Sequence, residues 1–244
     1  MSRITQLLAG HFPILKRQDP RTATPPRPPS PLEGGDRHTI FTQIHQVNHW
    51  GDSESLSGPG STLAYTQNIR TELPKLWERL GTRVILDAPS GDFNWFRAIP
   101  RSRELHYIGG DIVENLVRAN RENYTDSQTR FMHLDIISDP LPDADFWLCR
   151  DCLFHLPTVD VLSVLRNFSM SRIPFLCTSV HPQCEVNSDI GTGDFRLLNL
   201  ERPPFNFGKA IAYIDDWIEG YPQRQLALWH RRDVANALGL ETHE

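Results

Sequence analysis

The sequence lacks any apolar run long enough to cross a bilayer, lacks internal repeats and contains only four cysteines. A membrane-spanning helix needs about 20 apolar residues, and a disulfide framework needs a denser set of cysteines. These absences favour a globular protein of a reducing, cytoplasmic compartment. The formal net charge is −5, and no basic stripe of the kind that nucleic-acid-binding proteins carry is present. We therefore expect neither a membrane nor a nucleic acid as a partner.

The sequence also lacks the common phosphate-binding motifs. A dinucleotide-binding turn needs three glycines so that a pyrophosphate can rest on a helix N-terminus. Here the apolar run at 84–86 leads into a turn with one glycine, Gly91, and the next residue is the acidic Asp92. A P-loop is absent as well. The ligand expected at this turn is therefore not anionic there, which argues against a nicotinamide dinucleotide enzyme.

Composition divides the chain into three parts. Residues 1–36 contain a run of prolines between positions 25 and 31 and are predicted to be a flexible tail. An organellar targeting segment at 1–17 stays open as an alternative, because basic residues precede the first acid. Residues 37–80 are predicted to form a helical cap, with a kink or break near Glu72 caused by Pro74. Residues 81–244 are expected to form one Rossmann-like domain.

From residue 81 onward, apolar runs alternate with amphipathic segments. Alternation with short turns indicates a parallel sheet covered by helices on both faces. The sequence therefore predicts an α/β fold with a doubly wound, seven-stranded, mostly parallel sheet. The expected strands are 83–87, 106–111, 130–135, 144–149, 173–180, 210–214 and 225–229, and the expected helices are about 92–99, 113–122 and 158–170.

Acidic residues stand where the first three expected strands end. Asp87, Asp111 and Asp135 follow successive apolar runs, and ligands of doubly wound sheets bind beyond the carboxyl ends of the strands. Asp111 comes 20 residues after Gly91, where an acid can accept both hydrogen bonds of a ribose diol. Asp135 with Ile136 suits an adenine ring. Each acid taken alone could equally be a helix cap, so the inference rests on the ordered set.

These residues resemble the class I, Rossmann-like S-adenosylmethionine-dependent methyltransferases. The segment 84–91 resembles the first motif of that family, and a longer string from Trp50 through 149–156 resembles a bacterial-type subgroup; Ser90 departs from the Cys or Gly common there. The resemblance implies S-adenosylmethionine as methyl donor, with S-adenosylhomocysteine as product. It also implies these cofactor contacts: Asp87, Ala88, Gly91, Asp111, Ile112, Asp135, Ile136 and Arg150.

The residues after the fourth expected strand bear on the chemistry of the acceptor. Nucleobase methyltransferases carry an Asn/Asp-Pro-Pro-aromatic turn there, whereas this chain has the segment 150–155. His155 is the candidate general base, and Asp151 is expected to orient it. The alternative, in which His155 is structural and Asp151 pairs with Arg150, stays open. The segment 178–181 lacks the acid and amide of a catechol-type metal site, so we expect no metal.

Two segments are candidates for the acceptor pocket. Residues 181–209 form a long polar stretch of the kind that serves as a lid, although a surface insertion remains an alternative. The cap segment is expected to close over the cofactor with this loop. The residues expected to contact the acceptor are Trp50, Ser57, Ser61, Trp95, His181, Arg196 and Asn199.

The sequence thus predicts methyl transfer to a hydroxyl or amine of a small molecule or sugar. A protein or RNA methyltransferase is the alternative within the same chemistry, and the acidic charge balance disfavours it. An alternative of another class is an inactive methyltransferase fold that serves as an interaction module. The sequence predicts neither the acceptor nor the oligomeric state.

Overall fold

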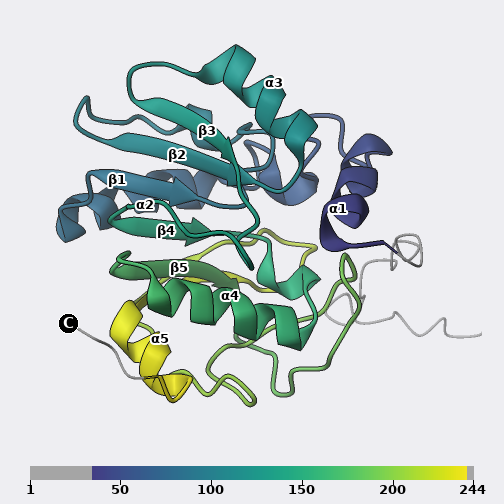
Figure 1. The fold of residues 1–244 in the computed structure, drawn as a ribbon, viewed down its shortest axis with the longest axis vertical. Coiled ribbons are helices and arrows are strands. Elements are labelled where there is room, and N and C mark those ends of the chain that lie inside the picture. The colour runs from purple at the N-terminus through teal and green to yellow at the C-terminus, as the bar shows by residue number, and fades with distance from the viewer. Residues whose placement is uncertain (1–34, 241–244) are drawn as a thin grey trace, which may run out of the picture.

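One seven-stranded sheet organises the molecule (Figure 1). The computed structural model describes residues 35–240, so the tail and targeting predictions for 1–36 fall almost wholly outside the described residues. The strands lie in the order β3-β2-β1-β4-β5-β7-β6, and β7 runs antiparallel to both of its neighbours. This confirms the predicted fold class. The strands are β1 (Val84–Asp87), β2 (His106–Asp111), β3 (Thr129–His133), β4 (Phe146–Cys149), β5 (Phe175–Val180), β6 (Ala212–Asp215) and β7 (Gln225–His230).

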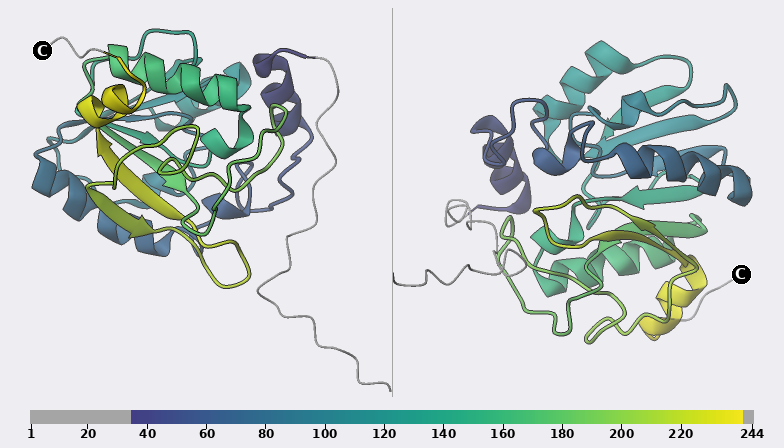
Figure 2. Two further views of the ribbon diagram at one scale, coloured as in Figure 1. Left: turned by 90° about the horizontal axis from the view of Figure 1, so that it is seen from below. Right: turned by 180° about the vertical axis from the view of Figure 1, so that it is seen from behind.

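Helices cover both faces of the sheet because neighbouring strand residues point to opposite sides. Ile85 packs in one core cluster with α2 (Gln67–Leu80) and with Val117 of α3 (Glu114–Tyr124). Leu86 packs in the other cluster with α4 (Thr158–Met170) and α5 (Arg231–Ala237). Figure 2 shows α2 behind the sheet, on the side opposite α4. Helices on both faces make this a doubly wound fold.

The remaining helix, α1 (Arg37–Gln46), lies beyond the carboxyl ends of the strands (Figure 1). It begins after Asp36, whose carboxylate accepts a hydrogen bond from the Thr39 amide at 2.8 Å and so caps the helix. Of its residues only Ile44 is buried. The helix is therefore placed over the edge of the sheet where ligands bind, and α2 belongs to the core. Every helix between residues 35 and 240 is too short or too polar to span a membrane.

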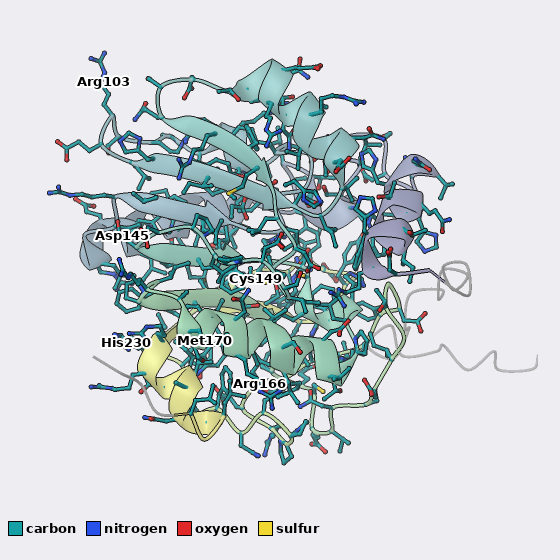
Figure 3. The ribbon with its side chains drawn as sticks, in the orientation of Figure 1. Arg103, Asp145, Cys149, Arg166, Met170 and His230 are labelled. Atoms are coloured by element: carbon teal, nitrogen blue, oxygen red, sulfur yellow. The ribbon has the colours of Figure 1, made fainter. Side chains whose placement is uncertain are left out.

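The centre of the sheet is apolar. Cys149, labelled near the middle of Figure 3, is fully buried in the core. All four cysteines are free and buried. Arg166, on the exposed side of α4, is one of the charged side chains at the surface (Figure 3).

The predicted helix at 92–99 is wrong. Only a single turn of 3-10 helix, η3 (Phe96–Ala98), forms there. Phe93 adopts a left-handed backbone conformation with φ of 60°, which an α-helix cannot contain. Asp92 is held by the cap instead, because its carboxylate accepts hydrogen bonds from the Ser55 hydroxyl and the Leu56 amide, both at 2.8 Å.

The expected break in the second helix does not occur. α2 begins at Gln67 and runs uninterrupted through Pro74 to Leu80. Proline removes one backbone hydrogen bond, but Leu73 and Trp77 on either side of it are buried in the core and hold the helix in place. Gly81 ends the helix in a left-handed conformation with φ of 65°, as its position predicts.

The long segment 181–209 is irregular throughout, but it is more than a lid. Leu198, Leu200 and Phe205 are fully buried in the core cluster that contains α4. The segment therefore covers the sheet face where a helix would otherwise lie. Its polar residues satisfy backbone groups of this irregular chain, as described below.

Candidate functional site

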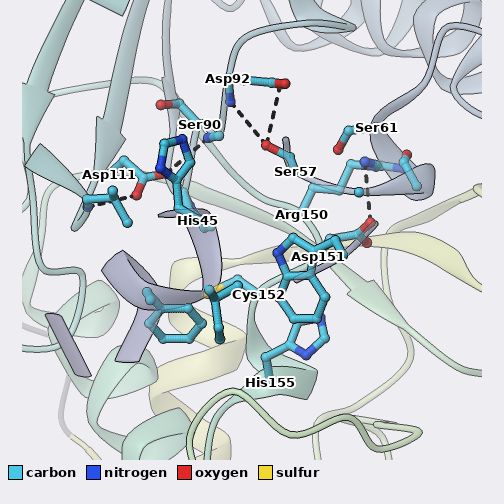
Figure 4. Close-up of a pocket in the computed structure, with 18 of the residues that line it drawn as sticks. His45, Ser57, Ser61, Ser90, Asp92, Asp111, Arg150, Asp151, Cys152 and His155 are labelled. Carbon is cyan, nitrogen blue, oxygen red and sulfur yellow. Dashed lines mark hydrogen bonds and ion pairs between the residues drawn. The ribbon is translucent and has the colours of Figure 1, made fainter. Parts of the chain in front are cut away.

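A cavity of about 540 Å³ lies at the carboxyl ends of the strands (Figure 4). Its walls are the strand ends, helix α1 and the cap segment between Trp50 and Ser61. One end is formed by the turn after β1 and by the ends of β2 and β3. The other end is formed by the residues after β4 and β5 and by aromatic side chains. Most residues of the two predicted groups, for the cofactor and for the acceptor, thus line one cavity.

The turn after β1 is tied to the end of β2. The amide of Gly91 donates to Asp111 Oδ2 at 3.0 Å, and the amide of Val113 donates to Asp111 Oδ1 at 3.0 Å. Burial raises the pKa of Asp111, and these two amides oppose the rise. Gly91 has φ of 56°, and a Cβ atom there would stand 2.2 Å from Ser57 Oγ. The turn therefore requires glycine, both for its conformation and for the close approach of the cap.

Among residues 35–240, several side chains that line the cavity carry a buried polar atom without a hydrogen-bond partner, and two of these atoms belong to residues near Asp111. They are Nε2 of His45, on α1, and Oγ of Ser90, in the turn. Both side chains lie beside Asp111 in Figure 4. A buried polar atom without a hydrogen bond costs about 1–3 kcal/mol, so such atoms point to a polar ligand. The hydroxyls of a ribose bound at Asp111 would satisfy both.

The residues after β2 and β3 supply an apolar surface with one acid. Ile112 and Ile136 line the cavity beside Asp135. The Asp135 carboxylate accepts hydrogen bonds from Arg37 of α1 at 2.9 Å and from the Ile137 amide at 3.0 Å. Burial alone would raise the pKa of Asp135, but these donors lower it below its ordinary value. The ion pair between Arg37 and Asp135 holds α1 over the part of the cavity that is expected to hold adenine.

Asp87 ends β1 inside the protein. It is 2 % exposed, lines the cavity and accepts a hydrogen bond from the Tyr107 hydroxyl at 2.8 Å. Burial raises its pKa to about 7, against the opposing effects of the Tyr107 hydroxyl and the Arg150 charge. Ala88, the next residue and an expected cofactor contact, does not line the cavity. Its side chain is fully buried in the core, because its amide bonds Leu148 and holds the backbone in the sheet.

Four charged side chains form a buried cluster at the far end of the cavity, and we name it the charge cluster: Arg150, Asp151, Asp216 and Arg224. Arg150 donates to both carboxylate oxygens of Asp216 at 2.9 Å. Arg224 contacts Asp151 Oδ1 at 2.7 Å and Asp216 Oδ2 at 3.1 Å. Two cations and two anions balance, which is the condition for burying charge.

Within the charge cluster, Arg150 and Asp216 favour their ionised forms. Burial alone would lower the pKa of Arg150, but the carboxylates of Asp151 and Asp216 raise it above its ordinary value. Burial alone would raise the pKa of Asp216, and the two arginines lower it instead. Arg150 also donates to the Gly60 carbonyl at 2.6 Å and stacks over Trp95, with its Cζ atom 5.1 Å from the ring centroid. Arg150 therefore ties the sheet to the cap rather than offering a free charge.

The expected contact between Asp151 and His155 is not made among the described residues. Asp151 instead binds Arg150, Arg224 and the Ser179 hydroxyl. The ion pair between Asp151 and Arg150 is the one that the alternative interpretation of the sequence expected. His155 Nδ1 lies 2.8 Å from the Asp194 carbonyl oxygen, which orients the ring. Burial lowers the pKa of His155 to about 4. His155 lines the cavity and packs against Trp50, with ring centroids 4.7 Å apart (Figure 4).

Five of the seven expected acceptor residues line the cavity, namely Trp50, Ser57, Ser61, Trp95 and His181. Arg196 and Asn199 do not. Arg196 donates to the carbonyls of Leu156 and Ser188 and to the Thr158 hydroxyl, at 2.6–2.9 Å. Asn199 bonds the Cys184 carbonyl and the Glu201 amide. Asn199 thus satisfies backbone groups within 181–209, and Arg196 ties that segment to Leu156 and Thr158.

Several cavity residues escaped the sequence analysis: Arg37, His45, His49, Tyr65, Phe195, Tyr221 and Arg224, together with Asp216 behind them. The sequence held one signal for Asp216 and Arg224. An antiparallel strand begins at the edge of the sheet where the parallel strands end. Residues that flank the expected strands at 210–214 and 225–229 can therefore lie at the edge that carries the cavity. For His45 the only signal was its place beside the apolar face of α1.

A group of metal-ligand type lies outside the cavity. Across residues 35–240, the ligand atoms of His38, Glu114 and His133 lie within 4.8 Å of one another. These residues stand at the starts of α1 and α3 and at the end of β3, and none of them lines the cavity.

No family model matches the chain, and no curated protein matches its sequence. Solved structures do resemble its fold. One is magnesium protoporphyrin IX methyltransferase from Synechocystis PCC 6803 with bound S-adenosylmethionine, at 16 % identity and a TM-score of 0.56, covering 81 % of this chain and 98 % of that one. Another is PigF with S-adenosylhomocysteine, at 15 % identity and a TM-score of 0.55, covering 81 % and 65 %.

A third is the methyltransferase domain of bacterial CtHen1, at 9 % identity and a TM-score of 0.51, covering 69 % of this chain and all of that one. The identities are low, so the likeness is one of fold. The sheet order and the antiparallel β7 agree with it. The chain has the class I S-adenosylmethionine-dependent methyltransferase fold.

Proposed function

We propose that this protein transfers the methyl group of S-adenosylmethionine to a hydroxyl or amine of a small molecule. The observation that carries the proposal is the arrangement around Asp111. Its carboxylate is held by the Gly91 and Val113 amides, and the unpartnered His45 Nε2 and Ser90 Oγ stand beside it. A ribose diol matches this set of donors and acceptors. Ile112 and Ile136 then offer apolar contacts to an adenine ring.

The methionine part of the donor would extend from the ribose along the glycine turn toward Asp87 and Trp95. Its sulfonium carries the methyl group, and the buried carboxyl of Asp87 offers a negative charge on this side of the cavity once it ionises. Methyl transfer is an in-line displacement, so the protein mainly aligns two reactants and excludes water. Helix α1 and the cap would exclude water here.

The size of the cavity supports a small acceptor. Donor and acceptor must share about 540 Å³, which lies within the usual range for small-molecule sites. The acceptor would lie at the end lined by His155, His181 and aromatic side chains. A sugar acceptor belongs to the same proposal, since it too is small and presents hydroxyls.

Calorimetry with S-adenosylhomocysteine tests the donor site. We expect saturable binding to the full chain and no binding of NADH, because Asp92 follows the turn where a pyrophosphate would lie. The variant His106→Phe is a matched control, since His106 is exposed at the opposite end of β2. Binding of NADH, or no binding of S-adenosylhomocysteine to folded protein, would refute the proposal. Release of S-adenosylhomocysteine from the methyl donor in the presence of candidate acceptors then tests turnover.

A further inference from the structure

Two histidines line the acceptor end of the cavity, and the backbone determines which nitrogen of each ring carries hydrogen. His155 ends the short 3-10 helix η4 (Leu153–His155), and His181 follows β5. Both rings pack around Phe154, with centroid distances of 4.6 Å and 5.2 Å. Both also approach Phe195, at 6.0 Å and 5.9 Å. The two histidines therefore flank the same pair of aromatic rings.

His155 presents a hydrogen-bond acceptor. Its Nδ1 lies 2.8 Å from the Asp194 carbonyl oxygen, and a carbonyl can only accept, so Nδ1 carries the hydrogen. Burial lowers the pKa of His155 to about 4, so the ring is neutral at neutral pH. A neutral imidazole has one hydrogen. The Nε2 atom of His155 therefore carries no hydrogen and presents a lone pair that can accept a hydrogen bond.

His181 presents a hydrogen-bond donor. The Leu198 amide donates to its Nδ1 at 3.2 Å, so Nδ1 is the bare nitrogen. Burial lowers the pKa of His181 to about 3, and the neutral ring carries its hydrogen on Nε2. Within residues 35–240, neither Nε2 atom has a hydrogen-bond partner. Two neighbouring histidines thus offer opposite roles to whatever enters the cavity.

The rest of the acceptor end is aromatic and electrically balanced. Trp50, Trp95, Tyr65 and Tyr221 line it together with Phe154 and Phe195. Each arginine lining the described cavity is ion-paired: Arg37 with Asp135, Arg150 with Asp216 and Arg224 with Asp151. A carboxylate or phosphate on the acceptor would compete with these pairs. Flat apolar rings match the walls better.

From this arrangement we infer that the group methylated is a hydroxyl on an aromatic small molecule, held between Nε2 of His155 and Nε2–H of His181. The inference rests on the proposed function and narrows its acceptor. A hydroxyl donates its hydrogen to His155, accepts from His181 with one lone pair and attacks with the other. A neutral amine has only one lone pair, which attack requires. A carboxylate has no hydrogen for His155, and the sulfur of a thiol is a weak acceptor for His181.

The transfer balances with these groups. The acceptor oxygen forms a bond to the methyl carbon while the bond between carbon and sulfur breaks, and its electron pair stays on the sulfur of S-adenosylhomocysteine. The hydroxyl proton passes to Nε2 of His155, which later returns it to solvent. His181 keeps its hydrogen and positions the oxygen. His155 is thus a catalytic residue, and His181 is a specificity residue that touches the acceptor.

Nuclear magnetic resonance tests the premise without a known acceptor. Long-range correlations between ring protons and ring nitrogens identify the tautomer of each histidine in ¹⁵N-labelled protein saturated with S-adenosylhomocysteine. We expect the Nδ1–H form for His155 and the Nε2–H form for His181, with assignments from His155→Gln and His181→Phe. The same tautomer in both rings would overturn the inference. Failure of S-adenosylhomocysteine to bind would instead refute the proposed function.

Matched acceptors test the conclusion. Naphthol, naphthylamine and naphthoic acid, all substituted at the same ring position, are compared with the holo protein by binding and by methyl transfer. We expect naphthol to be preferred at least about tenfold, and His181→Phe to abolish that preference. His155→Gln should lower turnover about 100-fold while leaving donor affinity unchanged, and His106→Phe should change neither. Preference for the amine or the acid, an unchanged preference in His181→Phe, or binding of none of the three would overturn it.

Discussion

The buried carboxyl of Asp87 makes the stability of the protein depend on pH in a direction opposite to that of most acids. Its pKa rises from 3.8 to about 7 on folding, because burial penalises the ionised form. Between these values unfolding releases a proton, so the free energy of unfolding falls as the pH rises. At about 1.4 kcal/mol per pH unit, the penalty is about 2 kcal/mol at pH 5 and about 4 kcal/mol at pH 8.

The variant Asp87→Asn removes this titration and keeps an oxygen for the Tyr107 hydroxyl. Urea unfolding of the protein without ligand, at pH 5 and at pH 8, gives the stability of variant and wild type at each pH. We expect the stability of the variant relative to wild type to be about 2–3 kcal/mol more favourable at pH 8 than at pH 5. Any fixed cost of the amide cancels in this comparison.

Asp143→Asn is the matched control, because Asp143 is exposed before β4 and should leave the pH dependence as in wild type. The reasoning is refuted if Asp87→Asn and wild type lose stability in parallel between the two pH values. It is also refuted if wild type gains stability across that interval while the variant does not, because that would be the signature of a lowered pKa.

Three further substitutions separate cofactor binding from folding. Gly91→Ala should weaken S-adenosylhomocysteine binding at least about tenfold in calorimetry, since a left-handed alanine costs about 1–2 kcal/mol and its Cβ meets Ser57; an unchanged affinity would contradict the placement of the donor. Asp111→Ala should cost about 1–3 kcal/mol of the same binding through the lost diol contact, whereas equal affinity would mean that the ribose binds elsewhere. Arg196→Met should lower the melting temperature and leave donor affinity intact, because Arg196 ties the irregular segment to Leu156 and to the start of α4 and does not line the cavity; a loss of affinity in folded protein would show a role in the site.

The grouping of Asp87, Asp111 and Asp135 at one end of the cavity was predictable because its signals are local in the sequence. Asp87, Asp111 and Asp135 each follow an apolar run, and parallel strands bring their carboxyl ends to one edge. The alternation of strands and helices predicted the doubly wound, mostly parallel sheet, whereas the strand order came from the structure. Ala88 was expected to contact the cofactor only because it stands inside the motif. Its side chain points into the core, because successive residues of a strand point to opposite faces of the sheet.

The acceptor end depends on contacts between distant residues, which no local pattern encodes. Arg150 pairs with Asp216, 66 positions later, and His155 is oriented by a carbonyl 39 positions later rather than by Asp151. The polar side chains of Arg196 and Asn199 suggested a ligand, but an irregular covering segment needs such groups for its own backbone. The residues around Phe93 have the sequence pattern of a helix. In the fold Phe93 has a left-handed backbone conformation, because the hydrogen bonds of Asp92 to the cap turn the chain there.

The antiparallel hairpin of β6 and β7 also determines the order in which the site can be completed during synthesis. A ribosome makes the chain from its N-terminus, so the turn at Gly91 and the carboxylate of Asp111 exist long before Asp216 and Arg224. Until those two emerge, Arg150 has no deep counter-ion, and an unpaired buried guanidinium is costly. A nascent chain can therefore form the Asp111 end of the cavity early, whereas the wall around Arg150 is completed only when the last two strands join the sheet.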